Sequence, residues 1–149
     1  MMLFAIFLHV LGVVVWMGGV MYQAHVLLPM ARRGQVAAFA LAARRARPVA
    51  WTALALIVLT GLYNVTRLGP LDRVMHSGAA TLLAGKLGLV LVLVALAGQR
   101  DFAQVTRLNR LVANAGDPAP ALSVIAWLDR IALLLGLVII YLGLAISRS

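Results

Sequence analysis

Hydrophobic residues in this chain gather into four long segments, and short polar segments separate them. The hydrophobic segments cover about residues 3–28, 49–68, 79–98 and 120–147. Each is near the ~20 residues that a helix needs to cross the hydrocarbon core of a bilayer. Pro29 follows the first segment and Pro48 precedes the second, as is typical where helices end and begin. The pattern predicts an all-α integral membrane protein with a single domain, folded as an up-down four-helix bundle.

The composition also indicates a membrane protein. Hydrophobic residues make up 64% of the 149 residues and the mean hydropathy is +1.02. Charged residues make up 11%, against roughly a quarter in an ordinary soluble domain. Cysteine is absent from the sequence, which excludes disulfides, iron–sulfur clusters and thiolate metal sites. The net charge of +9 comes from arginines near the predicted helix ends, and we expect a lipid bilayer rather than nucleic acid as the partner of this charge.

Arginines are distributed unevenly between the predicted loops. Those that lie between the first and second segments, or between the third and fourth, are Arg32, Arg33, Arg44, Arg45, Arg47, Arg100, Arg107 and Arg110. By the positive-inside rule these loops face the cytoplasm, so both chain ends lie outside. We therefore expect a multi-pass protein of the bacterial inner membrane with both termini on the periplasmic side. Glutamate is absent from the sequence, and the aspartates are expected outside the spans.

Lys86 is the only lysine of the chain, and it lies inside the third hydrophobic segment. A cation in hydrocarbon costs a few kcal/mol, so it normally has a partner or a function. With a rise of 1.5 Å per residue, Lys86 lies roughly 10 Å and His9 roughly 9 Å below the same membrane edge. His76, Tyr63 and Tyr141 fall near that level. The alternatives are that Lys86 extends to the membrane surface and that the tyrosines are interface aromatics.

The first segment carries two further patterns. Trp16 follows His9 by seven residues, so the two share one face of the predicted helix. Met17, Met21 and His25 are spaced four residues apart and predict a second stripe. Because Cu(I) prefers thioether and imidazole ligands, this stripe is a candidate copper path. Methionine is also a common filler of helix interfaces, which is the alternative interpretation.

Two segments resemble the CopD-like and HemJ-like membrane proteins of the copper resistance D superfamily. They are Leu8–Tyr22, with its histidine, tryptophan and glycine pair, and Gly85–Arg100, with its lysine. Resemblance to the HemJ-like proteins implies a bound b-type haem and porphyrin oxidation, with His9 as an axial ligand and Lys86 as an essential residue. Resemblance to the CopD-like proteins implies copper passage across the inner membrane.

Three functions follow from these observations. The favoured hypothesis is a bundle that binds haem b for electron transfer or porphyrin oxidation, with a quinol or a periplasmic carrier as electron partner. Its cofactor-binding residues would be His9, Lys86, His76, Trp16, Tyr63 and Tyr141. The second hypothesis is copper transport, with metal ligands His9, His76, Met17, Met21 and His25. The third is a small accessory subunit of a larger membrane complex, such as a respiratory one. Whether the chain is an enzyme stays open.

Overall fold

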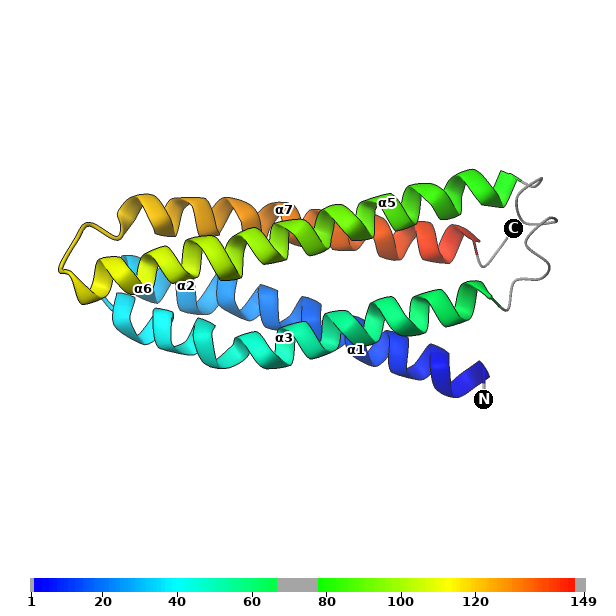
Figure 1. Ribbon diagram of the computed structural model, residues 1–149, viewed down its shortest axis with the longest axis horizontal. Helices are drawn as coiled ribbons and strands as arrows, with labels where there is room; N and C mark the ends of the chain where they lie inside the picture. The colour runs from blue at the N-terminus through cyan, green and yellow to red at the C-terminus, as the bar shows by residue number, and fades with distance from the viewer. Residues whose placement is uncertain (1, 67–77, 147–149) are drawn as a thin grey trace.

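The computed structural model describes residues 2–66 and 78–146, and its regular structure is helical throughout these residues (Figure 1). The described residues form four helical rods, each long and apolar enough to cross a membrane. The predicted all-α chain with four such helices is therefore confirmed for this part of the protein. His76, one of the candidate ligands, lies in residues 67–77 and thus outside the described residues.

The first rod consists of α1 (Met2–Tyr22), a π-helical turn η1 (Gln23–Leu27) and α2 (Leu28–Arg32). It continues past Pro29, where we predicted an end. In the π turn the backbone N–H of Leu28 donates to the carbonyl of Gln23, five residues back. Pro29 then lies in the first turn of α2, where a missing N–H is tolerated. The rod therefore passes the proline by changing its hydrogen-bond pattern.

The second rod is α3 (Val36–Val65), which begins thirteen residues before the predicted start at 49 and contains Pro48. Its early start follows from an alanine-rich segment, because alanine has the best helix propensity. Phe39, Ala40 and Ala43 are buried there, so packing also holds this half of the helix. The arginines at 44, 45 and 47 that we assigned to a loop consequently lie on a helix.

The third rod runs through α5 (Gly78–Gly98), a second π-helical turn η2 (Gln99–Gln104) and α6 (Val105–Ala113). The predicted end at 98 is therefore only the end of its first part. The fourth rod is α7 (Ala119–Ile146), close to its predicted range. Each π turn carries a buried polar residue, Gln23 at the first position of η1 and Arg100 at the second position of η2. π turns often occur at functional sites, and these two lie beside each other in the bundle.

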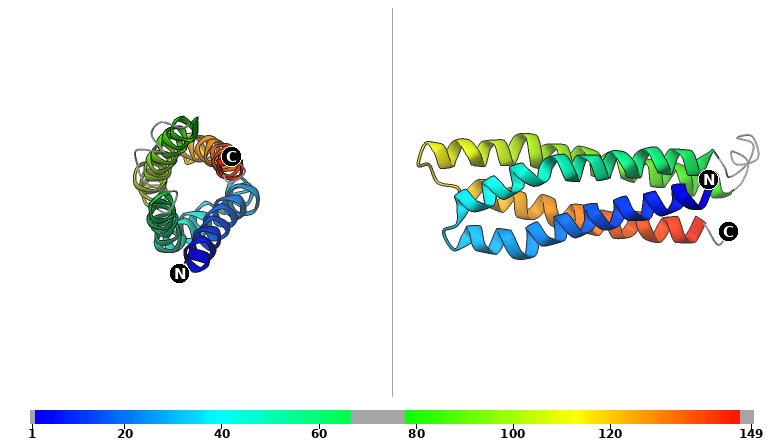
Figure 2. Two further views of the ribbon diagram at one scale, coloured as in Figure 1. Left: turned by 90° about the vertical axis from the view of Figure 1, so that its right-hand side faces the viewer. Right: turned by 90° about the horizontal axis from the view of Figure 1, so that it is seen from below.

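The rods run alternately up and down around a common axis (Figure 2). The start of α1 and the end of α7 lie at the same end of the bundle, here called the terminal end. The opposite end carries the α2–α3 and α6–α7 turns with several exposed arginines, and is here called the Arg-rich end. Along the bundle α1 packs on α3, and α5 packs on α7.

Two clusters of buried apolar residues fill the bundle. One lies at the Arg-rich end and includes Phe39, Leu108 and Ile125. The other surrounds Trp16 near the middle and includes Leu54 and Leu93. Large apolar side chains cover the outer surface, including Leu3, Phe4 and Val14 on α1. Such a surface is what a lipid-facing bundle requires.

Candidate functional site

Three rods turn residues toward the bundle interior at intervals of seven. These residues are His9, Trp16 and Gln23 on the first rod, Lys86, Leu93 and Arg100 on the third, and Gly143, Gly136 and Asp129 on α7. The first rod meets α7 where Trp16 and Met17 lie against Gly136, and Lys86 meets α7 at Gly143. Seven helical residues rise about 10 Å. The interior is therefore organised in three layers, which we name after His9, Trp16 and Arg100.

The His9 layer lies toward the terminal end. The Nδ1–H of His9 donates to the carbonyl of Ile57 and to Oγ1 of Thr60, at 3.0 Å each. Thr60 is buried, and its hydroxyl donates to the carbonyl of Leu56 at 2.5 Å. The His9 ring also lies over Gly61, where a Cβ would come within 3.3 Å of the imidazole. Three contacts from α3 thus fix the orientation of this imidazole.

These hydrogen bonds determine which ring nitrogen of His9 carries the proton. A carbonyl oxygen only accepts, so the nitrogen that contacts Ile57 must donate. In the neutral imidazole the proton of His9 is therefore on Nδ1, and Nε2 carries the lone pair. Histidines that ligate metals commonly hold their second nitrogen to a carbonyl in this way. The Nδ1–H of His9 is therefore held as it commonly is in metal-binding histidines.

Lys86 belongs to the same layer, as the sequence predicts. Its side chain is partly buried, and it occupies the space beside Gly143, where a Cβ would lie 2.9 Å from Nζ. The charge of Lys86 is close enough to His9 to act on the imidazole. Among the described residues both ion pairs involve Arg100, so no carboxylate there pairs with Lys86.

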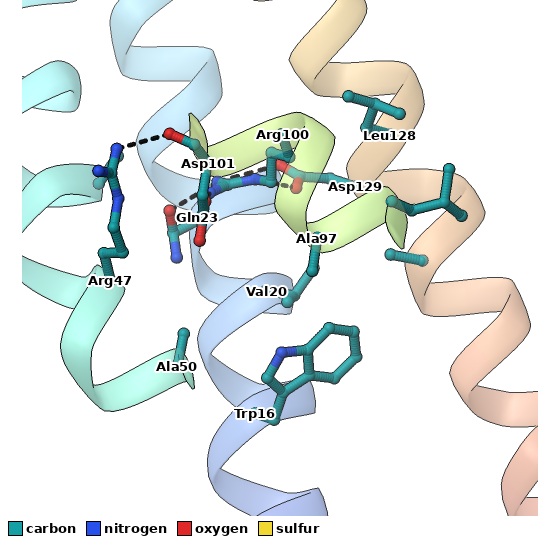
Figure 3. A pocket seen from close by; sticks show the side chains of 13 residues that line it. Trp16, Val20, Gln23, Arg47, Ala50, Ala97, Arg100, Asp101, Leu128 and Asp129 are labelled. Carbon is teal, nitrogen blue, oxygen red and sulfur yellow. Dashed lines mark hydrogen bonds and ion pairs between the residues drawn. The ribbon is translucent and has the colours of Figure 1, made fainter. Parts of the chain in front are cut away.

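The Arg100 layer lies toward the Arg-rich end and is a buried charge network (Figure 3). Arg100 donates from Nε to Asp129 Oδ1 at 2.5 Å, from Nη1 to Asp101 Oδ1 at 2.7 Å and from Nη2 to Gln23 Oε1 at 2.6 Å. Asp129 is fully buried and the other three are nearly so. The guanidinium therefore joins the first, third and fourth rods.

Two residues of α3 connect the second rod to this network. Trp51 donates its indole N–H to Asp101 Oδ2 at 2.9 Å, and Arg47 donates to the Asp101 carbonyl at 2.5 Å. Arg47 also lies over the ring of Phe102, 5.1 Å from its centroid. A cavity of about 20 Å³, enough for one water, lies between this network and Trp16. All four rods thus meet at Asp101 and Arg100.

The hydrophobic pattern of the sequence did not predict this layer. We placed Arg100 in a loop and the aspartates outside the spans, whereas Arg100, Asp101 and Asp129 are buried inside the bundle. The physical reason is that the charges neutralise one another, which lowers the cost of burying them. Asp129 lies within the predicted fourth segment, and a carboxylate in an apolar run could have indicated the site.

The structure does not bring the remaining candidate residues together. Tyr141 is 71% exposed and Met21 is 59% exposed, and both face away from the interior. His25 is exposed, and its Nδ1–H donates to the Met21 carbonyl on its own helix. Tyr63 is half-buried on α3. Of the predicted copper stripe, Met17 alone lies against the neighbouring rod, at Gly136.

Metal binding by hard ligands finds little support in this geometry. Within residues 2–66 and 78–146 no three histidine or acidic side chains come together in a group that could hold a metal ion. Outside the Arg100 network, the interior donors include the imidazole of His9 and the thioether of Met17, which are ligands suited to soft metals.

Comparison with known proteins gives one match. The family model described as copper resistance protein D matches residues 40–146. The chain belongs to this family. The matched range contains Lys86, Arg100 and Asp129, while α1 with His9 lies outside it. No curated protein and no solved structure matches the chain significantly.

The copper resistance protein D family is the CopD-like family that the sequence resembles, so this prediction is confirmed. Membership makes the chain a multi-pass membrane protein related to copper resistance. It favours copper, our second hypothesis, over haem, our first. Haem b gains no support from the family description, and the accessory-subunit hypothesis stays a prediction.

Proposed function

We propose that this chain moves copper ions across a lipid bilayer through the interior of its four-helix bundle, acting as a single transmembrane domain. The family description supports copper as the cargo. The positive-inside rule supports an orientation with the Arg-rich end in the cytoplasm and the terminal end in the periplasm of a bacterial inner membrane. Copper would pass between the His9 and Arg100 layers.

The observation that carries this proposal is the state of the His9 imidazole. Ile57 and Thr60 hold its Nδ1–H, which leaves the Nε2 lone pair as a soft donor near the terminal end. Cu(I) is bound by imidazole, and it does not need a carboxylate cage. A single strong donor also suits passage, because an ion that is transported must be able to leave. His9 is therefore the residue we expect to receive copper.

The proposal is tested by copper flux into sealed proteoliposomes that contain a Cu(I)-selective fluorescent chelator. We expect the wild-type protein to admit Cu(I), and His9→Ala to remove most of this flux because the soft donor is lost. His25→Ala is the matched control, since His25 lies on the same rod but is exposed and bonds only its own helix. It should keep the wild-type rate.

Two results would contradict the proposal. No flux above that of protein-free vesicles would remove copper transport as the function. Equal loss of flux in both histidine variants would remove His9 as a specific copper ligand, because the control differs from it in position alone.

A further inference from the structure

A second soft donor group lies in the middle of the bundle, about 10 Å from the His9 layer along the axis. Trp16 is 4% exposed, and Met17 is partly buried beside it. Both lie against Gly136 of α7, where a Cβ would come within 2.5 Å of the Met17 Sδ and 3.9 Å of the Trp16 ring. The thioether thus occupies the space that a side chain at 136 would fill.

The surroundings of this group are apolar. Leu93 from the third rod and Leu54 from α3 belong to the same buried cluster, together with Ala132 of α7. A hard or multiply charged ion would lose its hydration there without replacement. A soft monovalent cation has two attractive groups available, the polarizable sulfur of Met17 and the aromatic ring of Trp16.

We infer that Met17 and Trp16 form a binding site for Cu(I), reached after His9 and before the Arg100 layer. This inference rests on the proposed copper passage for its physiological cargo. Two weak donors bind an ion loosely, which is what a position along a transport path requires. Met21 and Met30 of the same rod are exposed, so Met17 is set apart from them by its position in the interior.

Silver(I) is a suitable probe, because it resembles Cu(I) in its ligands and does not change oxidation state under the conditions of the assay. Silver nitrate is titrated into the full-length protein in detergent, in a buffer without chloride, while tryptophan fluorescence is recorded. The contribution of Trp16 is obtained by difference from Trp16→Phe, because the chain has three tryptophans. We expect saturable quenching of the Trp16 emission in the wild-type protein.

Met17→Leu is the decisive variant, because leucine keeps the volume and removes only the sulfur. It should lose the saturable quenching of Trp16, while the matched control Met21→Leu should retain it. Gly136→Ala provides a second test, since its methyl group would push the thioether away and should also weaken silver binding. Unfolding temperature is measured for each variant, so that loss of binding is separated from loss of fold.

Unchanged quenching in Met17→Leu would overturn the inference. If wild-type vesicles admit copper but Met17→Leu quenches like the wild type, copper transport is supported and the Met17 site is rejected. If quenching depends on Met17 but the protein admits no copper into vesicles, the site is supported and the proposed transport is rejected.

Discussion

At the scale of single residues, Lys86 and His9 have opposite effects on a cation that enters their layer. The Nε2 lone pair of His9 attracts a cation, while the ammonium of Lys86 acts on the same imidazole and repels one. Lys86 has no carboxylate partner among the described residues. A cation bound at His9 is therefore held less tightly than it would be beside a neutral side chain.

Lys86→Leu tests this opposition, because it removes the charge and adds no copper ligand. We expect Cu(I) to be held about tenfold more tightly, as the loss of ~1.4 kcal/mol of repulsion would give. Competition with a Cu(I) chelator in detergent measures the change. Arg130→Leu, at an exposed position of α7, is the control and should leave affinity unchanged. Weaker binding in Lys86→Leu would instead make the lysine amine a ligand.

At the scale of elements, the two π turns place the charges of the Arg100 layer. η1 supplies Gln23, and η2 supplies Arg100 and Asp101, so that one guanidinium joins three rods. A buried ion pair adds little net stability compared with apolar packing, but an unpaired buried charge is very costly. The network therefore fixes which faces of the rods meet.

Arg100→Leu should lower the free energy of unfolding by about 3–5 kcal/mol, because it leaves Asp129 buried without its partner. Arg107→Leu, on the exposed face of α6, is the control and should change stability by no more than about 0.5 kcal/mol. The double variant Arg100→Leu with Asp129→Leu should recover part of the loss, because both charges are then absent. Thermal or denaturant unfolding in detergent provides the measurement. A single variant as stable as the control would show that the network is not required.

The difference between these two layers explains what the sequence could predict. Lys86 and His9 each lie in an uninterrupted α-helix, so counting residues at 1.5 Å per step places them at the same level. The predicted helix boundaries at Pro29 and Pro48 were wrong, because the chain accommodates both prolines inside rods. The Arg100 network was not predicted because its partners are 29 and 77 residues apart in sequence, and only tertiary packing shows that they neutralise one another.

At the scale of the whole molecule, packing is uneven along the bundle axis. Buried apolar clusters fill the Arg-rich end and the middle, as far as Trp16. Beyond Trp16 toward the terminal end, Ala5, Gly12 and Thr60 are buried, and the interior carries His9 and Lys86 instead of large apolar groups. Among the described residues the interior toward the terminal end is therefore the more polar part, and we predict that water-soluble reagents reach it more readily than the apolar cluster at the Arg-rich end.

The absence of native cysteine allows a direct test of this asymmetry, because each introduced thiol is the only one in the chain. Asn64→Cys, near the terminal end of α3, should react with a water-soluble maleimide in oriented vesicles. Ala126→Cys is buried in the cluster at the Arg-rich end and should stay unreactive from that side. Labelling is measured by the mass shift of the intact protein. Reaction of Ala126→Cys with slow or absent reaction of Asn64→Cys would place the more accessible part of the interior at the opposite end.

The balance of charge within the Arg100 layer has a consequence for how the bundle responds to the membrane potential. Arg47 and Arg100 offset Asp101 and Asp129, so this layer carries no net formal charge and the field exerts little force on it as a unit. Lys86 has no such compensation among the described residues. Moving one elementary charge through the field involves about 2.3 kcal/mol per 100 mV. A Cu(I) ion carries one such charge, so copper passage should depend on voltage even without Lys86. Any further dependence that arises from movement of the protein's own charges should originate in the His9 layer, although more charges are buried at the other end.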